Sequence, residues 1–306
     1  MPESINARDA IRPTMGIILV RYGELALKSR PVRLRFERAL MRNIEEQFLL
    51  HNAECIISRE WGRILAHVAD EAKAAKILSR VFGITSFSPA MECPSEMRSV
   101  AELAARRSLA LLKDGQSFAI RARRTGTHPY SSQQLAALAG SAVMDANRGR
   151  GIRVDLSSPD VEIFIEVRGK TAYIIADRFP GPGGLPMGTQ GRVVVLVDGE
   201  NGAAAAWMMM KRGCRVIAAG CGDGAKEAHG IVVPWAPGIA LHELPDVSME
   251  ALERFARRRR AEALVLGSTF EEMEKGIPQA GMPVLYPLCG LGLKDIAGLV
   301  DRIRAG

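Results

Sequence analysis

A glycine- and proline-dense segment, FPGPGGLPMGTQG at residues 179–191, divides this chain of 306 residues into two parts. Eight of its thirteen residues are Gly or Pro, a density that disfavours regular helix and strand. Each flanking part is long enough to close a hydrophobic core of its own. We therefore expect a multidomain protein with a linker at 181–191.

The net positive charge of +7 lies entirely before the end of that linker. Residues 1–191 contain 27 Lys and Arg against 20 Asp and Glu, whereas residues 192–306 contain 14 of each. Net charge governs association rather than fold, so this imbalance indicates a polyanionic partner for the first part.

The sequence favours a cytoplasmic protein without membrane contact. It has no apolar run long enough to span a bilayer, and MPESINARDA at its start is not a signal peptide. The cysteines show neither a C-x-x-C pair nor metal-ligand spacing with histidine, which argues against disulfides and against a zinc site. They are Cys55, Cys93, Cys214, Cys221 and Cys289.

Hydrophobic spacing predicts two α+β units before the linker. After a polar tail at 1–14, the first unit has the β-α-β-β-α order of a small ferredoxin-like sandwich, with elements at 16–22, 33–50, 54–58, 63–68 and 70–81. The second unit begins near Gly83, with helices at 99–112 and 131–147 and strands at 117–123, 153–156, 162–168 and 171–177. In the helix at 131–147, Ser131 or Ser132 is the expected N-cap. Its expected inward-facing residues are Leu135, Leu138, Ala139, Ala142 and Val143.

After the linker, a strand at 192–197, a helix at 203–212 and a strand at 215–219 are typical of the opening of a doubly wound α/β domain. Later strands are expected at 263–267 and 282–285, and a closing helix at 294–304. Such domains bind their ligands at the carboxyl ends of the strands.

A basic segment, FAIRARRTGTHPYSSQQ at 118–134, is the first candidate site. Because side chains alternate along a strand, Phe118, Ile120 and Ala122 are expected to be buried, and Arg121 and Arg123 then share the opposite face. The end of the strand adds Arg124, His128, Ser131 and Ser132. Guanidinium forks and helix N–H groups suit phosphate, although a solvated basic face is the plainer interpretation of such a strand.

A second candidate, DGENG at 198–202, stands between a strand and a helix, where α/β proteins place a phosphate loop. It carries two carboxylates, Asp198 and Glu200, and no lysine. Each would repel a phosphate at contact range by roughly 1–4 kcal/mol. Without a bridging metal the loop is a poor ATP site, and an ordinary tight turn is an equally good interpretation.

Two further features are weaker. The arginine run at 257–260 suits a solvated helix surface, with RNA backbone contact as the alternative. Cys214 and Cys221 flank the strand RVIAAG, and both are expected in or near the core.

Several stretches closely resemble tRNA 4-thiouridine synthetases, and together they cover nearly the whole chain. They are RYGELALKSRPVRLRFERALMRNIE (21–45), RVFGITSFSPA (80–90), the THUMP-like stretch at about 99–177, GPGGLPMGTQGRV (181–193), AAWMMMKRGCRV (205–216), ALVLGSTFEEMEKGI (263–277) and PVLYPLCGL (283–291). The resemblance implies a ferredoxin-like domain at 15–74, a THUMP RNA-binding domain at 75–180, and a shortened, degenerate PP-loop domain of the adenine nucleotide alpha hydrolase type at 192–306.

In that family the first two domains grip the tRNA acceptor end, and the PP-loop domain adenylates a uridine with ATP and Mg so that sulfur can displace AMP. Sulfur arrives as a persulfide, often from a rhodanese domain. Some members work as homodimers, and some also supply thiamine synthesis.

The resemblance carries over unevenly. The residues that match the family's RNA-binding pattern are Arg121, Arg123, Arg124, His128, Ser131, Ser132, Arg168, Gly183 and Gly184, followed by Leu185 and Pro186. The family's S-G-G-x-D-S loop is replaced by Asp198, Gly199, Glu200, Asn201 and Gly202, with Asn201 opposite the functional aspartate. Residues 247–260 contain no acceptor cysteine, and we expect no rhodanese domain after Gly306.

These observations leave three hypotheses. The first is a tRNA-binding paralogue with impaired catalysis that docks tRNA for thiolation or for another modification enzyme. The second is an active ATP-dependent tRNA sulfurtransferase that makes 4-thiouridine with an external sulfur-donor protein. In the third, the C-terminal domain is a protein interaction platform and the THUMP module is merely retained.

Overall fold

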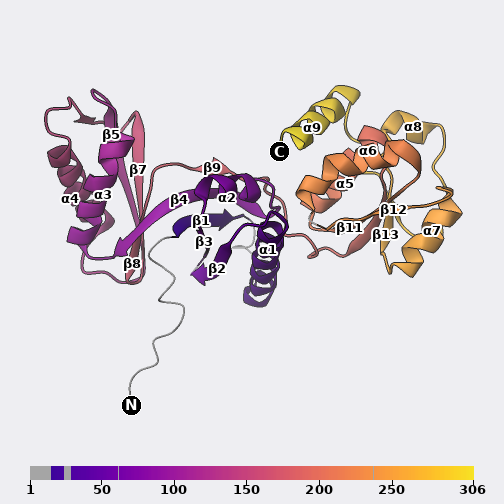
Figure 1. The fold of residues 1–306 in the computed structure, drawn as a ribbon, viewed down its shortest axis with the longest axis horizontal. Coiled ribbons are helices and arrows are strands. Elements are labelled where there is room, and N and C mark those ends of the chain that lie inside the picture. Colours follow the sequence, from indigo (N-terminus) through magenta and orange to yellow (C-terminus); the bar gives the residue numbers. More distant parts are fainter. Residues whose placement is uncertain (1–14, 24–28, 61, 237) are drawn as a thin grey trace, which may run out of the picture. The chain divides into compact units, whose positions relative to one another are not determined.

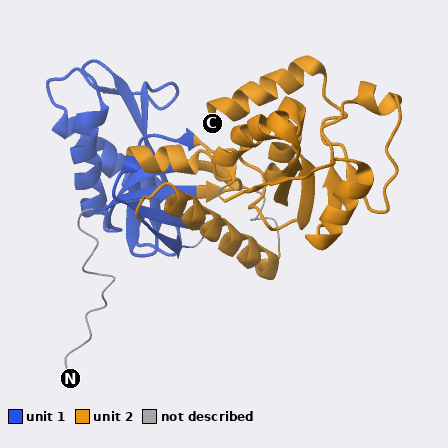
Figure 2. Ribbon diagram, turned by 45° about the vertical axis from the view of Figure 1, so that its right-hand side comes forward, with its two compact units in different colours: residues 1–20, 55–71, 87–179 blue, residues 21–54, 72–86, 180–306 orange. Residues whose placement is uncertain are grey.

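The computed structural model describes residues 15–23, 29–60, 62–236 and 238–306, so the predicted tail at 1–14 lies outside the described residues. The chain forms two compact units (Figure 2). Unit 1 comprises residues 1–20, 55–71 and 87–179, and unit 2 comprises residues 21–54, 72–86 and 180–306.

A nine-stranded sheet runs through unit 1 (Figure 1). Its strands follow the order β2-β3-β1-β4-β8-β7-β5-β6, and β9 pairs with β4. The strands are β1 (Gly16–Tyr22), β2 (Cys55–Glu60), β3 (Arg63–Val68), β4 (Ile84–Pro94), β5 (Ser117–Thr125), β6 (Arg153–Val154), β7 (Val161–Arg168), β8 (Thr171–Ile175) and β9 (Phe179–Pro180). The strands of the expected ferredoxin-like domain and those of the expected THUMP domain therefore belong to one sheet.

The joining strand, β4, is absent from the sequence prediction. It lies between β1 and β8, and its pairing with β8 runs antiparallel from Ala90 opposite Ile175. Its centre is difficult to recognise because Ser86 and Ser88, which are both buried, interrupt the apolar pattern.

Two helices, α3 (Met97–Leu111) and α4 (Ser132–Ala146), cover the part of the sheet that contains β5, β7 and β8 and close one hydrophobic core with it. As expected, Phe118, Ile120 and Ala122 contribute to this core. Leu138 does not, because its side chain is 41% exposed. The buried stripe of α4 runs Leu135, Ala139, Val143 at steps of four, and Leu138 falls beside it.

Unit 2 contains a five-stranded parallel sheet of order β12-β11-β10-β13-β14. Renumbered along the chain this is 3-2-1-4-5, the doubly wound order expected, with its switch point between β10 and β13. The strands are β10 (Arg192–Leu196), β11 (Arg215–Gly220), β12 (Leu241–Glu243), β13 (Ala263–Val265) and β14 (Val284–Leu285). The helices are α5 (Gly199–Lys211), α6 (Gly222–Val232), α7 (Met249–Arg258), α8 (Phe270–Glu274) and α9 (Leu293–Ala305), with a 3-10 turn at Val233–Trp235.

Unit 2 also holds α1 (Arg30–Leu50) and most of α2 (Glu71–Leu78). Phe82, which follows α2, packs against Trp207 and Trp235 with ring centroids 5.5 and 5.4 Å apart. This cluster belongs to the main core of unit 2. The predicted domain boundary between residues 74 and 75 lies within α2. Within the described ranges, no helix is both long enough and apolar enough to cross a membrane.

Candidate functional site

The end of β5 lines a cavity of about 410 Å³ in unit 1. Arg123, Arg124 and Ser132 contribute to its wall, and so does Arg168 at the end of β7. Strand register brings Arg124 close to Arg168, because Arg124 pairs with Val167 and Thr125 with Arg168 in the parallel β5–β7 ladder. Four of the nine residues predicted to bind RNA therefore share one concave surface, which we call the β5 cavity.

Positive charge predominates in the β5 cavity. Glu166 is its one carboxylate, and it is shared between Arg168 at 3.1 Å and Arg63 at 3.5 Å. Arg123 and Arg124 are exposed, and neither has a carboxylate partner among the described residues. The sequence analysis missed Arg63. This residue begins β3, and only the folded sheet brings it next to Glu166 near the end of β7.

Arg121 makes different contacts from Arg123, although the two are separated by one residue on β5 and are expected to share a face. Its Nε donates to Glu162 Oε1 at 2.7 Å, and its Nη2 donates to the Leu156 carbonyl at 2.8 Å. It does not line the β5 cavity. Its charge is largely matched within the protein, unlike that of Arg123.

The segment between β5 and α4 is held by internal contacts. Ser131 is the N-cap of α4: its hydroxyl accepts from the Gln134 amide at 3.1 Å, and the Gln134 side chain accepts from the Ser131 amide. His128 Nε2 lies 3.2 Å from the Thr125 carbonyl, and its ring packs against Tyr130. Ser132 is the first helical residue, so the amino end of α4 opens on the β5 cavity.

Gly183 and Gly184 belong to unit 2, and both have positive φ, at 68° and 76°. Gly183 exchanges backbone hydrogen bonds with Gly83 and Ile84. A Cβ at Gly184 would collide with the Lys211 carbonyl, to which Leu185 donates at 2.9 Å. Both glycines therefore allow the backbone conformation of the linker, in addition to the RNA contact that is predicted for them.

The DGENG segment lies at the switch point of the parallel sheet. Asp198 is the N-cap of α5, and Gly199 to Gly202 form its first turn, four residues earlier than predicted. Gly202 packs so closely on Val197 that a Cβ would approach its backbone to 2.9 Å, and Gly267 after β13 similarly faces Asn201. The close packing and the free helix amides of a nucleotide loop are thus present.

The side chains of this turn are acidic. Asp198 is exposed and makes no capping hydrogen bond, and Glu200 pairs with Arg304 of α9 at 2.8 Å. No group of three or more His, Cys, Asp or Glu in the described chain is arranged to hold a metal ion. The turn therefore offers amide donors together with two carboxylates, a combination that fits a triphosphate poorly.

The cysteines around β11 differ from each other. Cys214 is buried, and burial raises the pKa of its thiol. Cys221 is exposed, contrary to expectation, because β11 ends at Gly220 and Cys221 becomes the N-cap of α6.

Comparisons with known proteins agree with this architecture. Residues 17–88 match the family model of the ThiI ferredoxin-like domain, and residues 99–177 match that of the THUMP domain. A probable tRNA sulfurtransferase of Methanosarcina acetivorans is 34% identical over 348 aligned positions, covering 98% of this chain and 84% of that protein. Its counterpart in Methanosarcina mazei is 44% identical over 334 positions, covering 94% and 82%.

Solved structures give the same result. PH1313 from Pyrococcus horikoshii Ot3 superposes with a TM-score of 0.80 at 30% identity, covering 94% of this chain and 99% of that one. A 4-thiouridine synthetase in an RNA complex with bound ATP has the same fold, with a TM-score of 0.75 at 23% identity and coverage of 94% and 85%. On the similarity of its sequence over nearly its full length, this chain belongs to the tRNA sulfurtransferase family and carries that family's ferredoxin-like and THUMP domains.

Proposed function

We propose that this protein binds tRNA through the β5 cavity and that its adenylating activity is lost or impaired, so that it presents tRNA to a thiolation or other modification enzyme. Membership of the tRNA sulfurtransferase family supports the RNA partner. A protein of the same fold has been crystallised with RNA.

The β5 cavity supports RNA binding on chemical grounds. Arg123 and Arg124 present guanidinium groups without carboxylate partners in the described chain, next to the amino end of α4. Guanidinium forks and helix amides are the groups that contact phosphates. Arg168 adds a third guanidinium, held in position by Glu166.

The acidic switch-point turn is the observation that carries the loss of activity. A triphosphate seated on the amino end of α5 would meet Asp198 and Glu200 in place of the serine hydroxyls of the family's loop. Arg304 pairs with Glu200 and offsets part of the charge of Glu200, but this pair does not offset the charge of Asp198.

The retained backbone of the same turn favours the second candidate, an active sulfurtransferase using ATP, Mg and an external sulfur donor. Gly202 and Gly267 allow its close packing, and the first amides of α5 have no partner within the helix. A divalent ion held by the carboxylates would be needed to offset the repulsion.

Incubation with unmodified tRNA, ATP, Mg²⁺ and a sulfide donor separates the two candidates. We expect no 4-thiouridine absorbance in the recovered tRNA, and its appearance would remove the proposal of lost activity.

Filter binding tests the RNA half. The double variant Arg123→Gln, Arg124→Gln is expected to weaken tRNA binding and to lower the dependence of log K on log salt by nearly one for each phosphate that is no longer neutralised. Arg98→Gln, Arg148→Gln removes the same charge from exposed positions on α3 and in the turn after α4, both outside the β5 cavity, so it is the matched control. Equal weakening in both variants would contradict a localised site.

A further inference from the structure

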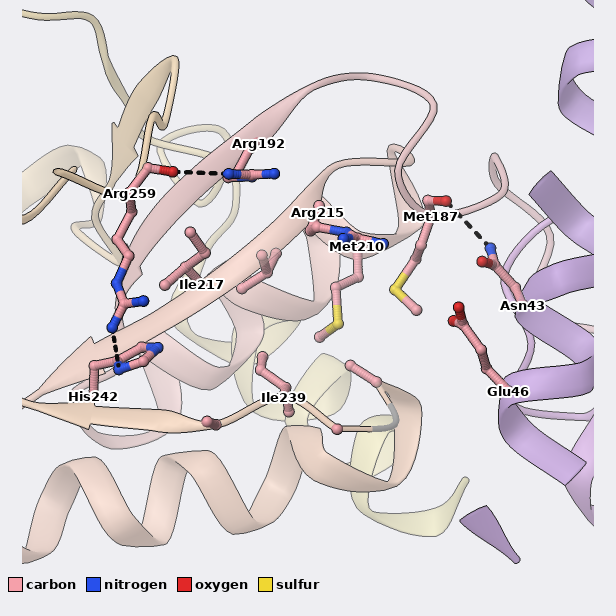
Figure 3. A pocket seen from close by; sticks show the side chains of 14 residues that line it. Asn43, Glu46, Met187, Arg192, Met210, Arg215, Ile217, Ile239, His242 and Arg259 are labelled. Carbon is pink, nitrogen blue, oxygen red and sulfur yellow. Dashed lines mark hydrogen bonds between the residues drawn. The ribbon is translucent and has the colours of Figure 1, made fainter. Parts of the chain in front are cut away.

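A second cationic surface lies at the amino ends of β10 and β11, the ends opposite the DGENG turn (Figure 3). Two cavities of about 450 and 420 Å³ meet there and share Arg192 and Arg215. We call this surface the amino-end groove. Its guanidinium groups belong to Arg42, Arg192, Arg215, Arg259 and Arg260, and its carboxylates to Glu46 and Glu262.

Arg192 and Arg215 are the first residues of their strands and are register partners in the parallel ladder. Like charges on paired residues of adjacent strands repel each other. Arg192 Nη1 donates to the Arg259 carbonyl at 2.9 Å, which neutralises no charge. Arg215 is exposed, and its side chain has no hydrogen bond or ion pair with any residue that the structure describes. An anion bound between the two would remove the repulsion.

The edge of the groove at the end of α7 is held by contacts within the protein. Arg259, the C-cap of α7, lies over the Phe255 ring at 5.2 Å, and its Nη2 is 3.1 Å from His242 Nδ1. Stacking and hydrogen bonding restrict the rotamers of this side chain, which lowers the entropy cost of binding. Arg260 follows with a left-handed φ of 54°, and its side chain lines the second cavity.

The floor of the larger cavity is apolar. Met187, Met210, Ile217 and Ile239 line it between Arg259 on one side and Asn43 and Glu46 on the other, as Figure 3 shows. Such a surface does not suit a free inorganic anion. An unpaired nucleotide presents both kinds of group, a phosphate for the guanidiniums and a flat base for the apolar side chains.

We propose that the amino-end groove is a second RNA-binding site, which holds the phosphodiester backbone of an unpaired segment of tRNA with a base against Met187 and Ile217. This inference rests on the proposed tRNA binding and extends it to a surface separate from the β5 cavity and the DGENG turn. The two joined cavities and their shared arginine pair suit successive phosphates better than a single ion.

The test is filter binding of tRNA over a range of salt concentrations, using Arg215→Gln, Arg260→Gln in the full chain. The expected result is weaker binding and a slope of log K against log salt reduced by about 1.4, since two phosphates of an unpaired segment, at about 0.7 each, are no longer neutralised. The matched control, Arg212→Gln, Arg302→Gln, removes two arginines that line neither cavity of the groove. Unchanged thermal unfolding of both variants shows that they are folded.

The outcomes separate the two proposals. If wild-type protein fails to retain tRNA at low salt, the proposed function fails. If it binds tRNA and the groove variant keeps the wild-type slope, only the groove proposal fails, as it would if the groove served an acidic protein. Photo-crosslinking followed by mass spectrometry gives a second readout: a nucleotide adduct on Met187 or in β11 supports the groove, and adducts confined to unit 1 overturn it.

Discussion

Glu200 Oε1 lies 2.8 Å from Arg304 Nη2, and this ion pair links the first turn of α5 to the last turn of α9. The two side chains are 52% and 44% exposed, so water screens the pair and its contribution to stability is below about 1 kcal/mol. Its larger effect is electrostatic, because it keeps a carboxylate beside the helix amides at the switch point.

Glu200→Gln is therefore expected to change the free energy of unfolding by less than about 1 kcal/mol and to strengthen ATP binding. The gain follows from removal of one charge that repels phosphate at contact range, about 1 kcal/mol or more. Isothermal titration with ATP measures it. Glu274→Gln, at an exposed position of α8, is the control, and an equal gain there would assign the effect to net charge alone.

Arg121→Gln is expected to reduce tRNA affinity less than Arg123→Gln does. Arg121 is paired with Glu162 at 2.7 Å and lines no part of the β5 cavity, whereas Arg123 lines it without a carboxylate partner in the described chain. Filter binding of the two single variants compares them directly. A larger reduction for Arg121→Gln would show that the ion pair with Glu162 opens and that RNA contacts Arg121 outside the β5 cavity.

Much of the fold is readable from the sequence because its signals are local. The periodic apolar residues of α1, α4 and α9 predict these helices to within a few residues, and apolar residues of α9, including Ile296 and Ile303, are buried. β4 escapes prediction because buried serines break its pattern, and its role depends on pairing with strands distant in sequence. The first turn of α5 escapes because its glycines suggest a loop, whereas Gly202 is required by close packing on Val197.

The candidate sites are less readable than the fold. Composition shows that the first part is basic, but it does not reveal that Glu162 engages Arg121 while Arg123 stays accessible. The amino-end groove has no contiguous signature, since Arg192 and Arg215 are brought together by strand register. Of the arginine run at 257–260, Arg257 pairs with Glu253 at 2.6 Å, and Arg259 and Arg260 line the groove.

Ser131→Ala should lower the free energy of unfolding of unit 1 by about 1 kcal/mol, because it removes the capping hydroxyl that accepts from Gln134. Its effect on tRNA affinity should follow from this destabilisation alone. Denaturant unfolding and filter binding test the two statements. Ser141→Ala, in the middle of α4 and exposed, is the control and should leave both quantities nearly unchanged.

His242, which lines the amino-end groove, makes the stability of the protein depend on pH. Burial and the neighbouring Arg259 hold the pKa of His242 below its ordinary value of 6.5. The unfolded chain then takes up this proton at a higher pH than the folded chain, so stability is lost as the pH falls through 6.5. His242→Asn, which keeps an acceptor for Arg259, should reduce that loss when unfolding is measured between pH 7.5 and 5. At pH 8 neither the folded nor the unfolded wild-type protein holds this proton, so the difference in free energy of unfolding between wild type and variant should no longer change with pH. A difference that stays constant down to pH 5 would contradict the assignment.

The linker glycines allow structural and RNA-binding roles to be separated. Gly184 and Gly188 both have positive φ, at 76° and 81°, so alanine at either position incurs a backbone cost of about 1–2 kcal/mol. Only at Gly184 would the new Cβ also collide with the Lys211 carbonyl, since nothing lies within 4 Å of a Cβ at Gly188. Gly184→Ala is therefore expected to lower the free energy of unfolding by about 1–3 kcal/mol more than Gly188→Ala.

Urea unfolding followed by tryptophan fluorescence suits this comparison. Lys211 Nζ lies over the Trp207 ring at 4.9 Å, so a displacement of Lys211 is expected to change the emission of Trp207. Equal destabilisation of the two variants would contradict the collision. If the folded fraction of Gly184→Ala also loses tRNA affinity relative to Gly188→Ala, the glycine contributes to RNA binding as the family resemblance implies. Unchanged affinity would show that Gly184 serves only the close packing of the linker against the end of α5.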